Sequence, residues 1–97
     1  MAAKILIKRQ FLEGQTEEIF GLLNELRIQA RNQQGFITGE TLHEHNNPKK
    51  TVLLVAWARI ENWFAWKEST ERHQLEAMLE IYQEGPTEYE EYVTVAE

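Results

Sequence analysis

The sequence predicts an α+β fold of the ferredoxin-like, split βαβ type, with helices on one face of an antiparallel sheet. Segments with an apolar period of two alternate with segments of period 3.6 in the order β-α-β-β-α-α-β. Only the third strand pattern is apolar on both faces, which is typical of a central strand. Right-handed crossovers then place the first and third strands in the middle of the sheet.

Length and composition limit the classes of function. A chain of 97 residues supplies one domain, which we assign to residues 1–97. Its net charge of −6 argues against nucleic acid or an anionic membrane as a partner. The absence of cysteine excludes a thiolate nucleophile and Cys-based zinc sites. No stretch approaches the ~18 apolar residues of a transmembrane helix, so we predict a soluble, cytoplasmic protein.

The first predicted strand covers residues 4–11 and contains one unexpected charge. Ile5, Ile7 and Phe11 share one side of this strand. Arg9 has the same phase and therefore points toward the apolar face. Two interpretations stay open: Arg9 snorkels to water near the strand end, or it is a cation that lines a pocket.

A helix and a hairpin are predicted next. Thr16 is the expected N-cap of an amphipathic helix that ends before residues 32–35, with Ile19, Leu22, Leu23, Leu26 and Ala30 on its apolar face. The second strand, residues 36–45, is polar and is expected at a sheet edge. The run Asn-Asn-Pro-Lys-Lys at residues 46–50 predicts the hairpin loop before the third strand.

Two helices and a last strand complete the pattern. A short helix over residues 61–68 is followed by a Ser69-Thr70 N-cap and a helix to about residue 83, and residues 89–95 alternate as the last strand. The inner face of the longer helix is expected to hold Leu75, Met78, Leu79 and Tyr82. Because the helices cover one face only, we expect a second copy of the chain to cover the other.

Three motifs together resemble the antibiotic biosynthesis monooxygenase family of the dimeric α+β barrel superfamily. They are Gly35-Phe36-x-x-Gly39, Trp57, and Glu61-Asn62-x-x-x-Trp66. The resemblance implies a homodimer of packed sheets, with a pocket between each sheet and its own helices. It also implies a cofactor-independent oxidation of a phenolic or quinol compound by O2, with Asn62 and Trp66 in the pocket.

The sequence departs from the family at one position and leaves two alternatives. Arg72 and His73 stand where those enzymes have a tyrosine. Haem-degrading relatives need a histidine ten residues past the helix tryptophan, and this chain has Glu76 there, so this reading is the less favoured. The other alternative is a non-catalytic dimeric module that binds a small aromatic molecule.

The candidate site residues follow from their chemistry. His73 is the candidate general base and Asn62, with Arg9, a candidate donor to an anion. Trp63 and Trp66 are either core anchors or the stacking wall for an aromatic substrate. Asn62 has the second interpretation of a helix-start cap, and His73 that of a surface residue. His43 and His45 are expected to be an exposed pair, and we predict no metal and no cofactor.

Overall fold

The computed structural model describes residues 1–95 and has the predicted order of elements. These are β1 (Ala3–Gln10), α1 (Thr16–Arg31), β2 (Phe36–Glu44), β3 (Asn47–Trp57), α2 (Ile60–Lys67), α3 (Thr70–Glu80) and β4 (Glu88–Val93). The predicted α+β class is therefore confirmed. Within residues 1–95, no helix combines the length and the hydropathy that a membrane crossing requires.

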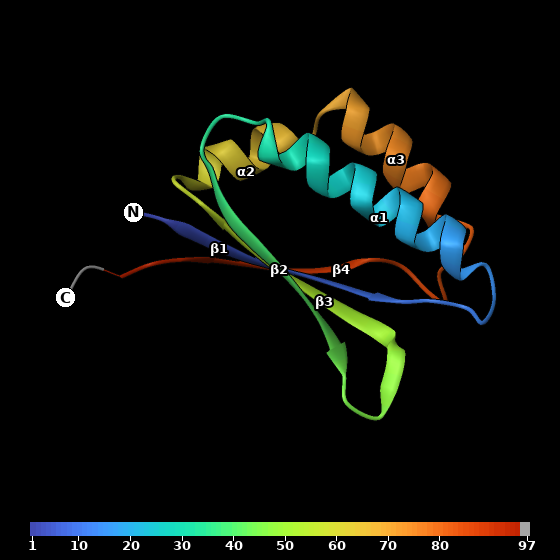
Figure 1. The fold of residues 1–97 in the computed structure, drawn as a ribbon. Helices are drawn as coiled ribbons and strands as arrows, with labels where there is room; N and C mark the ends of the chain where they lie inside the picture. Colours follow the sequence, from blue (N-terminus) through green and yellow to red (C-terminus); the bar gives the residue numbers. More distant parts are fainter. Residues whose placement is uncertain (96–97) are drawn as a thin grey trace.

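The four strands form one antiparallel sheet in the order β2-β3-β1-β4. The central positions predicted for the first and third strands are confirmed, as is the edge position of the polar second strand. All three helices lie on one side of this sheet, and the β2–β3 hairpin extends away from them (Figure 1). Within residues 1–95, the helices therefore cover one face of the sheet and leave the other face without cover.

The alternation along β1 decides which side chains meet the helices. Ile5, Ile7 and Arg9 are buried on the helix side, and Ile5 pairs in register with Val55 of β3. The same phase of β3 carries Leu53, Val55 and Trp57 toward the helices. Its other phase, Val52 and Leu54, is therefore the outward one.

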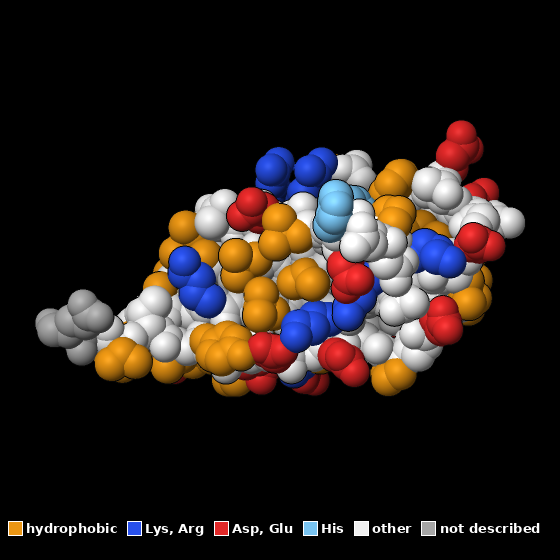
Figure 2. Space-filling view, turned by 90° about the horizontal axis from the view of Figure 1, so that it is seen from below, with side chains coloured by type: hydrophobic (Ala, Val, Ile, Leu, Met, Phe, Trp, Pro, Cys, Tyr) orange, Lys and Arg blue, Asp and Glu red, His pale blue; other side chains and the backbone are white. Residues whose placement is uncertain are grey.

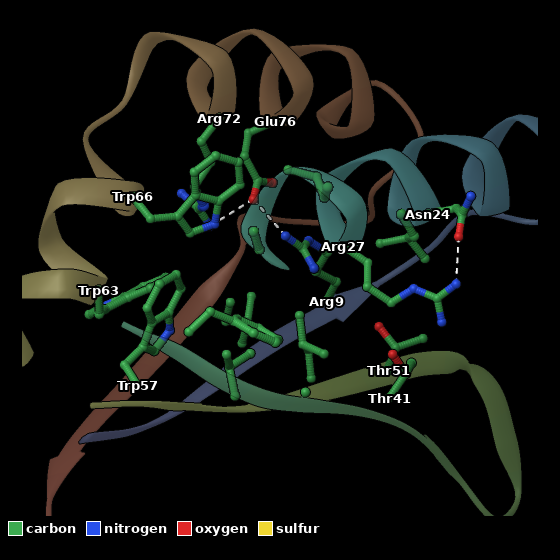
Figure 3. Close-up of a pocket in the computed structure, with 18 of the residues that line it drawn as sticks. Arg9, Asn24, Arg27, Thr41, Thr51, Trp57, Trp63, Trp66, Arg72 and Glu76 are labelled. Carbon is green, nitrogen blue, oxygen red and sulfur yellow. Dashed lines mark hydrogen bonds and ion pairs between the residues drawn. The ribbon is translucent and has the colours of Figure 1, made fainter. Parts of the chain in front are cut away.

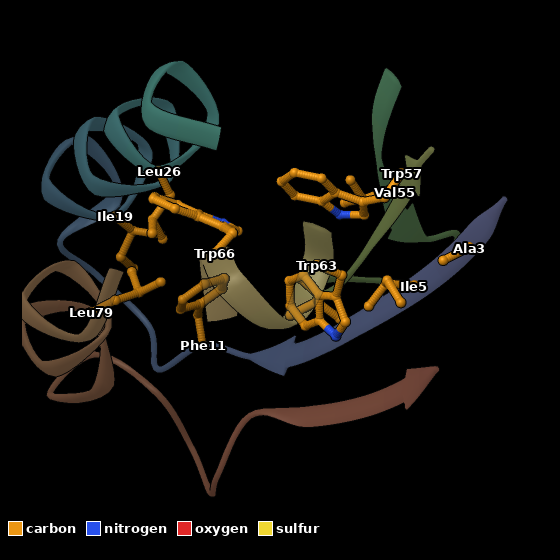
Figure 4. Close-up of a cluster of buried hydrophobic side chains, with 11 residues drawn as sticks. Ala3, Ile5, Phe11, Ile19, Leu26, Val55, Trp57, Trp63, Trp66 and Leu79 are labelled. Carbon is orange, nitrogen blue, oxygen red and sulfur yellow. The ribbon is translucent and has the colours of Figure 1, made fainter. Parts of the chain in front are cut away.

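The core lies between this face and the helices and is dominated by aromatic rings. Trp57 and Trp63 are fully buried, and Trp66 is 4% exposed. Figure 4 shows Trp66 from α2 lying between α1 and the end of β1, near Leu26, Ile19 and Phe11. Burying such large side chains supplies much of the apolar stabilisation of a chain this short.

The predicted N-cap of α3 is confirmed, and that of α1 needs correction. Ser69 caps α3 as expected, since its Oγ accepts a hydrogen bond from the Arg72 backbone N–H at 3.2 Å. The N-cap of α1 is Gln15 in a left-handed conformation, with no side-chain cap bond, and Thr16 is the first helical residue.

Two further corrections concern the hairpin and the face of α3. Residues 47–50, predicted as loop, belong to β3 because they pair with β2 and with the end of β1. Met78, predicted to face inward, is 55% exposed. Leu79 is buried as predicted, and Arg72 and Glu76 share its inward face at helical spacings of four and three.

The outward face of the sheet has an apolar centre. Figure 2 views the molecule from this side and shows hydrophobic side chains grouped in the middle, with charged side chains around them. The register sets Leu6 beside Leu54 there, and Lys8 forms an ion pair with Glu90 nearer to β4. A face of this kind is typical of a surface that another protein chain covers.

Candidate functional site

A cavity of about 450 Å³ lies between α1 and the helix-facing side of the sheet. Its walls come from β1, β2, β3 and all three helices. Figure 3 shows the tryptophans at one end of the cavity and Asn24, Arg27, Thr41 and Thr51 at the other. A volume of this size can hold a small aromatic molecule.

Three indole rings form the inner end of the cavity. The Trp57 and Trp63 ring centroids are 6.3 Å apart, and Phe36 meets Trp57 edge-on at 5.5 Å. Trp66 lines the same end from α2. The Trp57 Nε1 atom is buried without a hydrogen-bond partner among the described residues. The wall is thus flat and aromatic.

A buried cluster of three charges lies in the cavity wall. Arg9 Nη2 donates a hydrogen bond to Glu76 Oε2 at 2.6 Å, and Arg72 Nη2 lies 2.7 Å from the same oxygen. Arg72 also donates to the Tyr89 hydroxyl at 2.8 Å. All three charged residues are at least 93% buried. Two cations against one carboxylate leave an excess positive charge, which favours an anionic occupant.

Trp63 connects the cavity wall to a second carboxylate at the far edge of the sheet. Its Nε1–H donates to Glu91 Oε2 at 2.6 Å, and Lys67 Nζ donates to the same oxygen at 2.9 Å. The Trp63 hydrogen bond, and then the Lys67 ammonium, lower the pKa of Glu91 below its ordinary value of 4.5. These bonds hold the Trp63 ring in place behind the cavity.

The outer end of the cavity is polar. Arg27 Nη2 donates to Asn24 Oδ1 at 2.6 Å on α1. His43 from β2 also lines the cavity, and its Nδ1 lies 3.0 Å from the Pro48 carbonyl oxygen. Because a carbonyl oxygen can only accept, Nδ1 is the donor in this hydrogen bond.

The structure brings three of the five predicted site residues together. Arg9, Trp63 and Trp66 line the cavity, and Arg9 is a pocket cation because its charge is buried against Glu76 instead of snorkelling to water. Asn62 and His73 are not among the lining residues. Of His73, Asn62 and Trp66, only Trp66 therefore lies in the wall of this cavity.

Helix geometry explains the two exceptions. His73 follows Arg72 by one residue, a rotation of about 100°, so it is exposed when Arg72 faces inward. The Asn62 side chain is directed at the backbone of Gly35, where an added Cβ would lie 2.2 Å from Asn62 Cγ. Asn62 thus supports the turn between α1 and β2 and does not line the cavity.

Sequence reasoning missed Arg72, Glu76 and His43 as cavity residues. The signal for the first two was present: Arg72 and Glu76 are one helical turn apart, and an inward Arg9 needs a carboxylate partner. His43 could have been recognised from its phase in β2, which it shares with the lining residues Gly39 and Thr41.

The features that a haem-degrading relative or a metal centre would need were sought among residues 1–95. The position that would supply the haem-ligating histidine is occupied by Glu76, whose carboxylate is paired with two arginines. Residues 1–95 contain no group of three or more His, Cys, Asp or Glu side chains arranged to hold a metal ion.

Comparison with known proteins gives matches in structure only. No protein-family model and no curated protein matches the chain. A conserved protein from Methanosarcina mazei Go1 has a TM-score of 0.87 at 20% identity, over 95% of this chain and 91% of that chain.

Two further solved structures carry functional names. SnoaB, a cofactor-independent oxygenase from Streptomyces nogalater, has a TM-score of 0.82 at 12% identity, over 100% of this chain and 97% of that chain. A structure named antibiotic biosynthesis monooxygenase has a TM-score of 0.85 at 12% identity, with 97% and 99% covered. In fold, this chain therefore matches the antibiotic biosynthesis monooxygenase structures, as its sequence motifs predict.

Proposed function

We propose that the protein is a cofactor-independent monooxygenase that oxidises a small phenolic or quinol-type compound with O2. The observation that supports this most is the cavity itself, which combines three indole walls with an excess of buried positive charge. The indoles suit a flat aromatic ring, and the charge suits its phenolate. The shared fold with a cofactor-independent oxygenase adds support.

The proposed reaction needs no external reductant. A phenol with an unsubstituted ring carbon and one O2 give a quinone and one water, so the substrate supplies all the electrons. Deprotonation makes the ring electron-rich enough to react with O2 directly. The protein then has two tasks, which are to accept the phenol proton and to stabilise the anion. Arg9 is the proposed donor to the anion.

His43 is the proposed general base. It replaces His73 in this role because His43 lines the cavity and His73 does not. With Nδ1 donating to the Pro48 carbonyl, Nε2 is the ring nitrogen that would take the phenol proton. A general base is typically worth about 10² to 10⁴ in rate. Its effect should shrink above the pKa of the substrate itself, where the phenol is already ionised.

We also infer that the protein acts as a homodimer through the outward sheet face. Leu6, Val52 and Leu54 lie on this face without cover from the helices of their own chain. A second copy would bury this apolar surface and bring additional stabilisation to a small domain.

Oxygen uptake with a panel of phenols and quinols tests the proposed activity. Purified wild-type protein should show no flavin or haem absorbance and should still consume O2. The kcat of His43→Ala should be about 10²- to 10⁴-fold lower. His45→Ala and His73→Ala are matched controls, because both residues are exposed and neither lines the cavity. Equal rates for all four proteins would overturn the role of His43. Binding of phenols without any turnover would instead favour the non-catalytic binding module.

A further inference from the structure

The outer end of the cavity is open to solvent, whereas the tryptophan end is buried. The lining residues that are exposed at this mouth include Asn24 and Arg27 on α1 and Thr41 and His43 on β2. Figure 3 shows Arg27 extending from α1 above Thr41 and Thr51, with Asn24 beside it. A ligand that packs against the indole rings therefore presents its other edge to polar, accessible side chains.

Charge is distributed unevenly between the cavity and the rest of the chain. The chain has a net charge of −6, yet three arginines and a single glutamate line the cavity. Arg9 and Arg72 are both paired with that glutamate, Glu76. Among residues 1–95, the side-chain partner of Arg27 is instead a neutral amide, that of Asn24. Arg27 is thus a cavity cation whose charge no carboxylate of the described chain offsets.

Asn24 holds the Arg27 guanidinium in place. The two residues are three apart on α1 and therefore neighbours on its surface, and Arg27 Nη2 donates to Asn24 Oδ1 at 2.6 Å. A guanidinium carries five N–H donors in a planar fork, so this bond leaves others for a ligand. The fork matches the two oxygens of a carboxylate, and a single unpaired cation matches its single charge.

We propose that the mouth is a carboxylate subsite in which Arg27 binds the carboxylate, so that the ligand is a hydroxy-aromatic carboxylic acid. The hydroxyl and the carboxylate would lie on the same edge of the ring system, because His43 and Arg27 both line the outer end. The unsubstituted part of the ring would lie against the indoles. This inference rests on the proposed function, because it requires that the cavity binds phenols.

The exposed mouth suits a permanent charge better than the buried end does. A carboxylate that is moved in among the indole rings loses its water and gains no partner there, which is costly. At the mouth it keeps part of its hydration and gains a hydrogen bond to a cation. Because solvent and salt screen an exposed pair, the gain in affinity should be moderate and should depend on ionic strength.

Isothermal titration calorimetry under anaerobic conditions tests the subsite on the unmodified protein. The probes are 4-hydroxy-2-naphthoate, its methyl ester and 1-naphthol, which share the ring system and the position of the hydroxyl. The ester keeps the shape of the acid but removes its charge. At neutral pH and low salt, we expect the acid to bind about 5- to 20-fold more tightly than the ester. This ratio should fall in about 0.5 M NaCl.

Variants then connect the preference to Arg27. Arg27→Gln removes the charge from an exposed position, and we expect the acid and the ester to bind it about equally while 1-naphthol binds as it does to the wild type. Arg31→Gln is the matched control, since Arg31 is exposed on the same helix four residues further on and does not line the cavity. It should keep the preference for the acid. Circular dichroism verifies that each variant is folded.

The outcomes separate this inference from the proposed function. Equal binding of the acid and the ester by wild-type protein would overturn the carboxylate subsite but leave the proposed phenol oxidation intact. A preference that survives in folded Arg27→Gln, or one that Arg31→Gln abolishes equally, would also overturn the role of Arg27. No binding of any of the three probes would show that the cavity does not take phenols, and it would overturn both proposals.

Discussion

The Asn62 side chain fills the space beside Gly35. A Cβ atom on Gly35 would lie 2.2 Å from both Cγ and Oδ1 of Asn62, and Gly35 has a positive φ of 86°. The Gly35 carbonyl oxygen also accepts a hydrogen bond from the Ala58 N–H at 2.7 Å. This contact joins the start of β2 to the end of β3 and to α2.

Gly35→Ala should therefore destabilise the protein by about 2–4 kcal/mol, from left-handed backbone strain and overpacking together. Urea unfolding measures the effect. Asn62→Ala in the same chain should recover about 1 kcal/mol, because it removes the nearest two of the clashing atoms. Gly21→Ala is the matched control: Gly21 lies in α1 with open space around it, so alanine there should stabilise by about 0.5–1 kcal/mol. A neutral Gly35→Ala would contradict this account.

Trp66→Ala should affect both stability and binding. The Trp66 side chain is 4% exposed and packs between α1 and β1, so its removal should cost about 3–5 kcal/mol of unfolding free energy. The same change should weaken binding of an aromatic ligand by about 1–3 kcal/mol. Chemical denaturation and ligand titration measure the two effects. Phe64 is also on α2 but is 44% exposed, so Phe64→Ala should change neither the unfolding free energy nor the binding affinity by a comparable amount.

Glu91 should make the protein less stable in acid. Its pKa is lowered in the folded state by the Trp63 hydrogen bond and then by Lys67. The added stability is thus complete above the ordinary pKa of 4.5 and is lost as pH falls through the folded value. Because the side chain is partly exposed, the effect should be at most about 1 kcal/mol. The difference in urea midpoint between pH 7 and pH 3 should be smaller in Glu91→Gln, and unchanged in Glu84→Gln.

A charge on the outward sheet face should dissociate the inferred dimer. Leu54 is half-buried on that face beside Leu6, so Leu54→Lys would place an ammonium group inside an apolar interface. Sedimentation velocity at micromolar concentration should give the mass of two chains for the wild type and of one chain for Leu54→Lys. Met78→Lys, a matched change on an exposed helix position, should remain dimeric. A monomeric wild type would remove the dimer from the proposal.

Most of the fold could be predicted from the sequence because two properties are visible in a short stretch of residues. These are which side chains share a face of a strand, and whether one or both faces of that strand are apolar. The position of Arg9 in phase with Ile5 and Ile7 followed from a period of two, and its burial is observed. The hairpin was harder. The Asn-Asn-Pro signal favours a turn at residues 46–50, but β3 begins at Asn47 because pairing with β2 and β1 supplies backbone partners there.

The candidate site was predicted less completely because a helix can rotate about its own axis. The spacing of the apolar residues in α3 predicts equally well that Met78 or Leu79 faces the core. The rotation is decided by the need of buried Arg9 for a carboxylate, which turns Glu76 inward and Met78 and His73 outward. That requirement joins residues 67 positions apart in the chain, and no local pattern contains it.

The excess of buried positive charge links the stability of the fold to what the cavity holds. Arg9 and Arg72 repel each other across a single carboxylate, so an anion bound beside them would stabilise the native state. A ligand that binds only the native state raises the unfolding free energy by about 2.7 kcal/mol at one hundred times its dissociation constant. The melting temperature of this protein should therefore rise with the concentration of any anion that fits, whether or not that anion is oxidised.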